Sequence, residues 1–278
     1  LAPLHNPANI MGIKVMQELL PGKKNIAVFD TAFHQTMEPK AYMYALPYAD
    51  YEDFKVRKYG FHGTSHKYVS GVAAEVIGGE ETKIIVCHLG NGASMSAVKN
   101  GKVVDTSMGL TPLQGLMMGT RCGDLDPAAV LYVMEKRGLD AAGMDKRMNK
   151  ESGLLGITGY SSDFRDIMKA SKEGDARAKL AFEMFAYRVK SYIGAYSAAM
   201  GGVDAIAFTG GIGENADLVR AEICKGLEYL GVDFDFEKNA IRASGTVELT
   251  KPNSKVKVLK IETAEELMIA NDTYRLGK

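Results

Sequence analysis

An arginine and a histidine in this chain each lie between glycines, a placement that suits the binding of an anion. Arg121 stands within residues 119–123 (GTRCG), and His62 stands within residues 60–63 (GFHG). The planar guanidinium fork matches a carboxylate or a phosphate, so the pattern favours a clamp on such a group over a solvated surface charge. The imidazole could donate a hydrogen bond to an oxyanion or a phosphoryl oxygen, while a purely structural histidine remains the alternative.

His62 and His66 also have the spacing with which a helix can hold a metal ion. No Glu and no third ligand lies between them, so the pattern disfavours a zinc site.

Two carboxylates, Asp30 and Glu265, could serve catalysis or bind a metal ion. Asp30 follows the apolar residues 26–29, which predict a short buried strand, and catalytic carboxylates of α/β proteins often follow such strands. A cap of the next turn is an equal alternative for Asp30. Thr263 and Glu266 fit a capping box, in which Glu266 turns back and leaves Glu265 free to project. Glu265 would then be a Mg²⁺ ligand or, more ordinarily, an exposed acid at a helix start.

Two fully apolar runs each stop in a glycine-rich loop. Residues 84–89 lead into Gly90-Asn91-Gly92, and residues 204–208 lead into the segment TGGIGEN at 209–215. Such runs predict buried strands of an α/β sheet, and glycines after them let backbone N–H groups approach an anion. Neither loop is a Walker A or a Rossmann fingerprint, and either could be a simple tight turn. Together they favour a nucleotide held between the two loops.

The elements that would position these residues follow from periodicity and from turn signals. Helices are expected at 9–20, from Asp126-Pro127 to Gly138, at 175–200, after residue 215 and from Thr263 onward. Residues 93–98 and 102–107 flank Asn100-Gly101, the pair favoured in a type I′ hairpin. Residues 39–58 are irregular and rich in tyrosine. This order predicts an α/β fold with a mixed sheet flanked by helices.

The bulk properties exclude few classes of protein but fit this fold. The chain has 278 residues, and 34 Lys and Arg balance 34 Asp and Glu, so nothing indicates nucleic acid or a membrane surface as a partner. The three cysteines lack CxxC spacing and predict reduced thiols in a cytoplasmic protein. No signal peptide and no apolar segment long enough to cross a bilayer is recognisable.

The motifs together resemble the acetate kinase family, whose conserved blocks they follow in order over essentially the whole chain. The matching blocks are FDTAFHQTM (29–37), KYGFHGTSHKYV (58–69), HLGNGAS (88–94), GTRCGDLDP (119–127), SSDFRDI (161–167), FTGGIGEN (208–215) and ETAEEL (262–267). The resemblance implies an actin-like ATPase fold of the ribonuclease H-like type. It implies reversible transfer of the γ-phosphoryl group of ATP to acetate, which gives ADP and acetyl phosphate and requires Mg²⁺ or, in its place, Mn²⁺.

The resemblance also implies a role for particular residues. Asp30 would orient or deprotonate the acetate–phosphoryl centre, His62 and Arg121 would stabilise the transferring phosphoryl group, and Glu265 would bind the metal ion. The ATP-binding residues would be His88, Leu89, Gly90, Asn91, Gly92, Asp163, Phe164, Arg165, Gly211, Ile212, Gly213, Glu214 and Asn215. The pocket for the acetate methyl group would consist of Leu4, Phe61 and Pro112.

Measured against the family, the chain is expected to lack the N-terminal half-domain. The expected division is a remnant of that domain at 1–30, the actin-like nucleotide-binding domain at 31–260, and a C-terminal helix at 261–278 that returns to the N-terminal domain. We expect this chain alone to have little or no kinase activity, and the apolar face of its last helix to be exposed or paired between chains. The resemblance also implies a homodimer.

Two other functions remain open at this stage. A close relative could act on propionate or butyrate, because one methylene changes binding in an apolar pocket by only about 1–3 kcal/mol. A non-catalytic actin-like nucleotide-binding module is the second alternative. The presence of Asp30, His62 and Arg121 together argues against it, since binding alone needs none of them.

Overall fold

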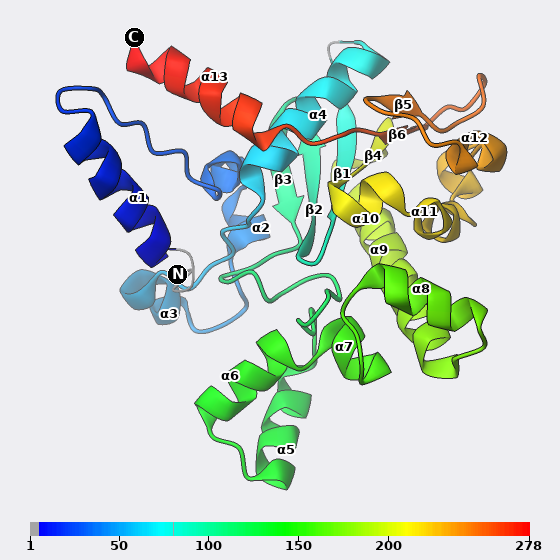
Figure 1. Cartoon of the computed structure of the whole chain (residues 1–278), viewed down its shortest axis with the longest axis horizontal. Coiled ribbons are helices and arrows are strands. Elements are labelled where there is room, and N and C mark those ends of the chain that lie inside the picture. Colours follow the sequence, from blue (N-terminus) through cyan, green and yellow to red (C-terminus); the bar gives the residue numbers. More distant parts are fainter. Residues whose placement is uncertain (1–5, 80) are drawn as a thin grey trace.

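The computed structural model describes residues 6–79 and 81–278, and its centre is a six-stranded mixed sheet in the order β3-β2-β1-β4-β6-β5 (Figure 1). β1, β4 and β6 run parallel, whereas β2, β3 and β5 pair antiparallel with their neighbours. The strands are β1 (Lys83–Leu89), β2 (Ala93–Lys99), β3 (Lys102–Thr106), β4 (Ala205–Thr209), β5 (Val247–Glu248) and β6 (Lys257–Lys260).

Helices account for most of the remaining described chain. The α-helices are α1 (Asn6–Leu19), α2 (Pro39–Tyr42), α3 (Tyr48–Phe54), α4 (Gly63–Ile77), α5 (Pro127–Arg137), α6 (Ala141–Lys150), α7 (Gly153–Thr158), α8 (Phe164–Lys172), α9 (Ala176–Met200), α10 (Gly210–Asn215), α11 (Asp217–Cys224), α12 (Phe236–Ala240) and α13 (Glu265–Gly277). Two 3₁₀ turns are η1 (Ala32–Thr36) and η2 (Glu228–Leu230).

Helices cover both faces of the sheet, and the alternation of side chains along β1 divides the core accordingly. Ile85, Cys87 and Leu89 belong to the large cluster that includes α9, whereas Ile84 and Val86 belong to a smaller cluster under α4. Successive side chains of a strand point to opposite faces, so a central strand covered on both sides must be apolar throughout. This explains the uninterrupted apolar run from which the strand was predicted.

Aspartates begin several helices by accepting a hydrogen bond from a backbone N–H of the first turn. Such a cap satisfies donors that have no partner within the helix. The capping residues are Asp126, Asp140, Asp163, Asp175 and Asp235. The predicted helices from 127 and from 176 are thereby confirmed, as is the hairpin whose Asn100 and Gly101 have φ of 51° and 72°.

The α/β class with a mixed sheet flanked by helices is confirmed, but three local predictions are wrong. Residues 26–29 form no strand and pair with none of the described strands, and Phe29 is exposed. Residues 39–58 contain the short helices α2 and α3. Thr263 does not cap α13, since its hydroxyl is engaged with Ser65 instead.

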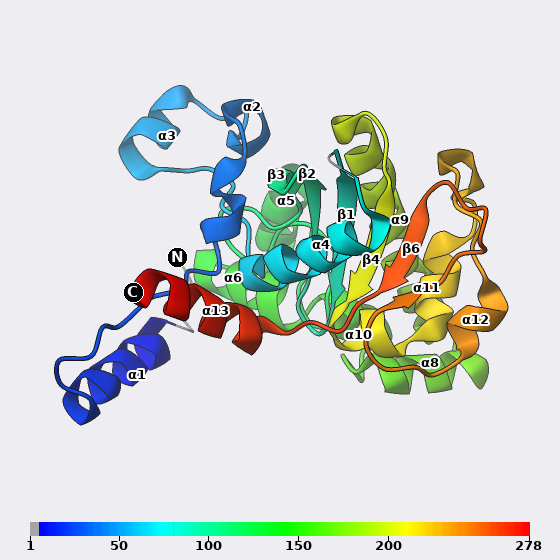
Figure 2. The ribbon, with the colours of Figure 1, turned by 90° about the horizontal axis from the view of Figure 1, so that it is seen from above.

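The two ends of the described chain extend from the body of the molecule. α1 and the chain that follows it lie to one side, near the end of α13 (Figure 2). Neither helix contains a buried residue, although Lys67 on α4 forms an ion pair with Asp272 on α13 at 2.7 Å. Within the described ranges, no helix combines the length and apolar character needed to cross a membrane.

Candidate active site

The two predicted glycine loops lie beside each other at one edge of the sheet. β1 and β4 are parallel neighbours in which His88 pairs with Thr209, so the chain leaves both strands at the same end. Gly210 has φ of 76°, and a Cβ atom there would lie 2.8 Å from the backbone oxygen of Leu89. Only glycine allows the second loop to approach the end of β1 this closely.

A cavity of about 740 Å³ opens where these loops meet α8, a volume suited to a small ligand. The first loop contributes Gly90 and Asn91 to its lining. Predicted residues from the other segments are Asp163, Phe164, Arg165, Gly211, Ile212 and Asn215. Sequence reasoning missed Ser162, Met168, Lys172 and residues 216–219, which also line it. The amphipathic pattern of α8, in which Met168 and Lys172 stand four residues apart, is the signal that could have indicated them.

The residues at the start of α8 differ in what they offer this cavity. Asp163 pairs with the exposed Arg165, and the hydrogen bond from that side chain lowers the pKa of Asp163 to about 2. The ring of Phe164 packs edge-on against Phe185, with 5.2 Å between the ring centroids, and is only 6% exposed. Phe164 therefore anchors the helix start to the core, while the Asp163–Arg165 pair faces solvent.

His62 and Arg121 come together over the first glycine loop. A Cβ atom at position 92, where glycine has none, would lie 3.5 Å from Nη1 of Arg121 and 3.6 Å from Nε2 of His62. The same Nη1 atom donates a hydrogen bond of 3.1 Å to the carbonyl oxygen of Pro112. Gly92 thus leaves open the space that both side chains border, and an anion there would meet a guanidinium and an imidazole.

His62 is held in place by its backbone and by Asp30. Its φ of 57° is in the left-handed region, which a non-glycine residue adopts rarely. The backbone N–H of His62 donates to Oδ2 of Asp30 at 2.7 Å, and the next amide, that of Gly63, donates to the Asp30 carbonyl oxygen at 2.8 Å. Asp30 therefore fixes the first turn of α4 that presents the imidazole.

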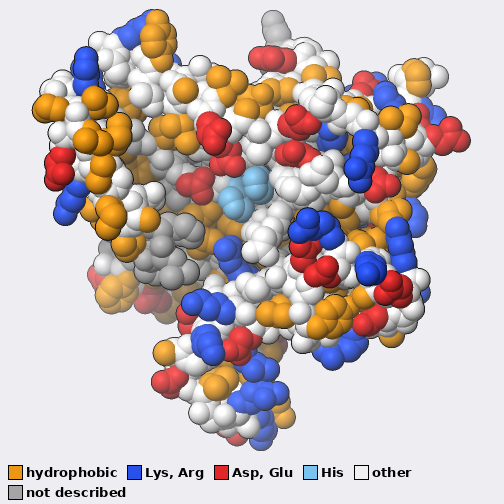
Figure 3. All heavy atoms as spheres, viewed as in Figure 1, with side chains coloured by type: hydrophobic (Ala, Val, Ile, Leu, Met, Phe, Trp, Pro, Cys, Tyr) orange, Lys and Arg blue, Asp and Glu red, His pale blue; other side chains and the backbone are white. Residues whose placement is uncertain are grey.

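Four histidines form a connected cluster behind this site. The rings of His62 and His88 stack with centroids 4.3 Å apart, and His66 and His34 lie in the next layer. Burial lowers the pKa of His62 to about 4 and that of His88 to about 3. These rings are consequently neutral at pH 7, and each has one N–H to donate. In Figure 3, histidine side chains reach the surface in the middle of the face, with acidic side chains beside them.

The two predicted carboxylates, Asp30 and Glu265, lie near each other. Burial and the nearby charge of Asp30 raise the pKa of Glu265, the first residue of α13. The two carboxylates are thus close enough to repel each other. The described residues contain no group of three His, Cys, Asp or Glu side chains arranged to hold a metal ion by themselves. A divalent cation beside these two acids would need further ligands from a substrate.

Some predicted ATP-binding residues face inward. The Glu214 carboxylate accepts hydrogen bonds from the backbone N–H groups of Gly210 and Thr263, so it joins the second loop to the chain before α13. Leu89 and Gly213 are buried, and Nδ1 of His88 is bonded to the Ser65 hydroxyl. The sequence carried no signal for these orientations, because they depend on contacts between distant segments.

Two of the three residues predicted for the substrate pocket, Phe61 and Pro112, are among the described residues. Phe61 is 7% exposed and belongs to the main core, next to His62 in the chain. Pro112 is adjacent to Arg121 through the hydrogen bond already described. Leu4 lies outside the described residues.

Comparisons with known proteins point to one family. The acetokinase family profile matches residues 1–271. The chain is 67% identical over 279 aligned positions to an acetate kinase of Fusobacterium nucleatum subsp. nucleatum. This alignment covers 100% of the chain and 70% of that protein. The structure of the chain resembles the Porphyromonas gingivalis acetate kinase with a TM-score of 0.96 and 52% identity, over 100% of this chain and 70% of that one. A Francisella tularensis propionate kinase matches with a TM-score of 0.90 and 46% identity, over 98% of this chain and 69% of that one.

Proposed function

The chain belongs to the acetokinase family, and from this membership we propose that its site transfers the γ-phosphoryl group of ATP to acetate. The observation that carries the proposal is the meeting of His62, Arg121 and the open side of Gly92 next to the cavity at the ends of β1 and β4. Phosphoryl transfer depends on positioning and charge neutralisation more than on covalent chemistry, and these residues supply both.

Each group has a task in the proposed reaction. A carboxylate oxygen of acetate attacks the γ-phosphorus, the bond from phosphorus to the bridging oxygen breaks, and ADP leaves with that electron pair. Arg121 and the N–H of neutral His62 stabilise the equatorial oxygens of the transferring group. Acetate, like a glutamate side chain, is already ionised at neutral pH, so Asp30 has to orient the site rather than remove a proton.

We further propose that ATP extends from the first glycine loop into the cavity, with the adenosine part between α8 and the second loop. The mixed polar and apolar lining by Asn91, Ile212 and Met168 supports this assignment. Mg²⁺, or Mn²⁺ in its place, would be held by Glu265 and Asp30 together with phosphate oxygens, which is how Mg²⁺ is usually bound in kinases. When bound, the ion would neutralise charge on the phosphates.

The test is an assay of protein expressed from the complete reading frame. Acetyl phosphate formed from ATP and acetate is trapped with hydroxylamine, and we expect metal-dependent formation of the hydroxamate. Propionate and butyrate serve as competing substrates, with kcat/KM expected to be lower by about tenfold or more per added methylene. ATP binding by calorimetry without any product would instead support a nucleotide-binding module, and higher kcat/KM on propionate would support a propionate kinase.

We also propose a homodimer located in the cytoplasm. The dimer rests on the resemblance to the family, and the location is supported by ATP as substrate and by three cysteines that are all free. Sedimentation of the complete protein should give twice the mass of one chain, and a monomer at micromolar concentration would overturn the dimer.

A further inference from the structure

The hydroxyl group of Ser94 lies between two imidazole rings of the histidine cluster. Its Oγ atom is 2.8 Å from Nδ1 of His62 and 2.7 Å from Nε2 of His66, and Ser94 and His66 are both fully buried. A hydroxyl has only one hydrogen to donate. Ser94 can therefore donate to one ring nitrogen, and the other ring must donate to Ser94.

The surroundings of His66 decide which ring is the donor. Its Nδ1 atom is buried and has no hydrogen-bond partner among the described residues. With the proton on Nδ1, His66 would bury an unpaired N–H, whereas with the proton on Nε2 it donates to Ser94 and leaves only a lone pair unpaired. Buried N–H groups without a partner are rarer than under-used acceptors. His66 thus donates from Nε2.

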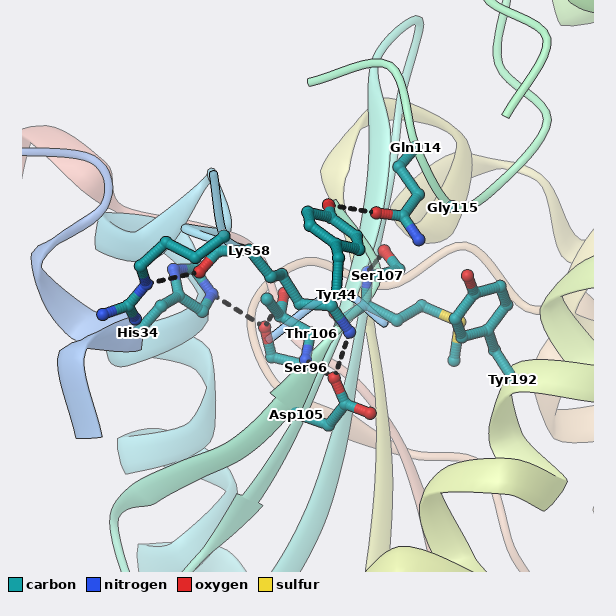
Figure 4. A network of polar contacts seen from close by, with 12 residues as sticks. His34, Tyr44, Lys58, Ser96, Asp105, Thr106, Ser107, Gln114, Gly115 and Tyr192 are labelled. Carbon is teal, nitrogen blue, oxygen red and sulfur yellow. Dashed lines mark hydrogen bonds and ion pairs between the residues drawn. The ribbon is translucent and has the colours of Figure 1, made fainter. Parts of the chain in front are cut away.

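The neighbouring histidine in the cluster shows the same choice independently. Thr106 donates its hydroxyl proton to the Met95 carbonyl, so Ser96 must donate to Thr106 in the 3.0 Å contact between them. His34 Nε2, also 3.0 Å from Ser96, must then be the donor (Figure 4). Nδ1 of His34 is likewise buried and unpaired, as in His66. In His34 and His66, the unpaired Nδ1 atom therefore carries a lone pair and not an N–H.

The proton of Ser94 is consequently free for Nδ1 of His62. We propose that Ser94 and His66 are positioning residues that keep the single proton of His62 on Nε2, the atom that faces Gly92 and Arg121. An imidazole without this support would favour a lone pair on Nε2, because that atom borders the guanidinium. Such a lone pair would repel a phosphoryl oxygen. The inference rests on the proposed function, since it concerns the donor to the transferring group.

The tautomer can be read directly in the ligand-free protein. In ¹⁵N-labelled protein at pH 7, long-range proton–nitrogen correlation spectra distinguish a protonated ring nitrogen from an unprotonated one, and a His62→Gln variant identifies the signals of His62. We expect Nε2 of His62 to be protonated and Nδ1 to be unprotonated. Protonation of Nδ1 of His62 in the wild-type protein would overturn the proposal, whether or not the Ser94 variant folds.

Ser94→Ala removes the hydroxyl that selects the tautomer, and Ser96→Ala is its matched control in the layer of His34. We expect Ser94→Ala to move His62 protonation towards Nδ1 and to lower kcat about tenfold to a hundredfold with KM nearly unchanged, the cost typical of losing a group that fixes a histidine tautomer. Ser96→Ala should change neither the His62 signals nor kcat. An unchanged tautomer in Ser94→Ala, or an equal loss of kcat in Ser96→Ala, would contradict the proposal.

Failure of the proposed kinase function can be distinguished from failure of the tautomer proposal. If the complete wild-type protein forms no acetyl phosphate, the kinase assignment fails, while the His62 tautomer remains measurable by its nitrogen signals.

Discussion

Arg121 is the residue whose charge and geometry matter most for the proposed transfer. It lies half-buried in a glycine turn, where Nη1 is directed by the Pro112 carbonyl. We expect Arg121→Ala to lower kcat about 10³-fold or more, and Arg121→Lys to recover little, because an ammonium cannot reproduce the planar fork. Steady-state kinetics measure both. Arg137→Ala, on the exposed end of α5, is the control and should leave kcat unchanged. A small effect of the Arg121 substitutions would remove Arg121 from the proposed machinery.

Glu214 illustrates how one side chain can have a structural role that the sequence did not indicate. Its carboxylate accepts from the N–H groups of Gly210 and Thr263, so Glu214→Ala leaves two amides without acceptors. We expect a loss of about 2 kcal/mol in the free energy of unfolding and weaker ATP binding, since the second loop loses its attachment to the chain before α13. Urea unfolding and calorimetry test this.

Glu237→Ala, an exposed change on α12, should alter the free energy of unfolding by less than about 0.5 kcal/mol. Normal stability and normal ATP affinity in Glu214→Ala would show that the inward carboxylate has no such role.

At the scale of elements, the Arg121 turn and the first glycine loop depend on a close backbone approach. The N–H of Gly119 donates to the Asn91 carbonyl at 3.0 Å, and a Cβ atom at Gly119 would collide with the Asn91 side chain. We expect Gly119→Ala to displace Asn91 and weaken ATP binding at least about tenfold, measured by calorimetry. Gly71→Ala is the matched control, because open space surrounds Gly71 in α4 and alanine should stabilise the helix by about 0.5–1 kcal/mol. Equal ATP affinities of the two variants would rule out the steric coupling.

The histidine cluster joins residues from η1, α4 and β1, and it should make stability depend on pH. Burial lowers the pKa of His34 to about 4, whereas the unfolded chain has a histidine pKa near 6.5. Above pH 6.5 both states are neutral at this ring. As pH falls below 6.5, only the unfolded state takes up the proton, so the free energy of unfolding decreases by about 1.4 kcal/mol per pH unit for such a histidine.

Urea unfolding at pH 7 and pH 5 measures this slope, and His34→Gln should make it shallower. Most carboxylates titrate below this range, so they add little to the difference. A slope that is the same in wild type and in His34→Gln would mean that His34 is not buried as a neutral ring.

At the scale of the whole molecule, α1 and α13 carry apolar side chains that nothing in the described chain covers. Met11 is 68% and Leu19 is 69% exposed on α1, and Leu267 is 52% exposed on α13. The prediction of an exposed face on the last helix therefore holds within this chain. The divisions at residues 30/31 and 260/261 stay predictions.

Exposed apolar surface of this extent should bind a hydrophobic dye. We expect the 278-residue chain to enhance the fluorescence of ANS, and Met11→Glu with Leu19→Glu to reduce that signal without changing the free energy of unfolding, since α1 buries no residue. Substitution of Lys146→Glu on α6 serves as the control for added negative charge. An ANS signal that the double variant leaves intact would place the apolar surface elsewhere.

The sequence alone determined the features that short-range chemistry controls. Continuous apolar runs specified the central strands, Asn100-Gly101 specified the hairpin, and Asp126 specified a helix start, because each depends on neighbours in the chain. The parallel arrangement of α/β strands made it possible to expect that both glycine loops would meet.

Only the tertiary structure decided where polar side chains turn. Residues 26–29 have the composition of a strand but pair with none of the described strands, and the Thr263 hydroxyl bonds Ser65 rather than its own helix. The bridge from His66 through Ser94 to His62 joins the start of α4 to the start of β2. Such contacts follow from burial, which requires each polar group to find a partner among whatever segments the packing brings near, and chain position does not encode that choice.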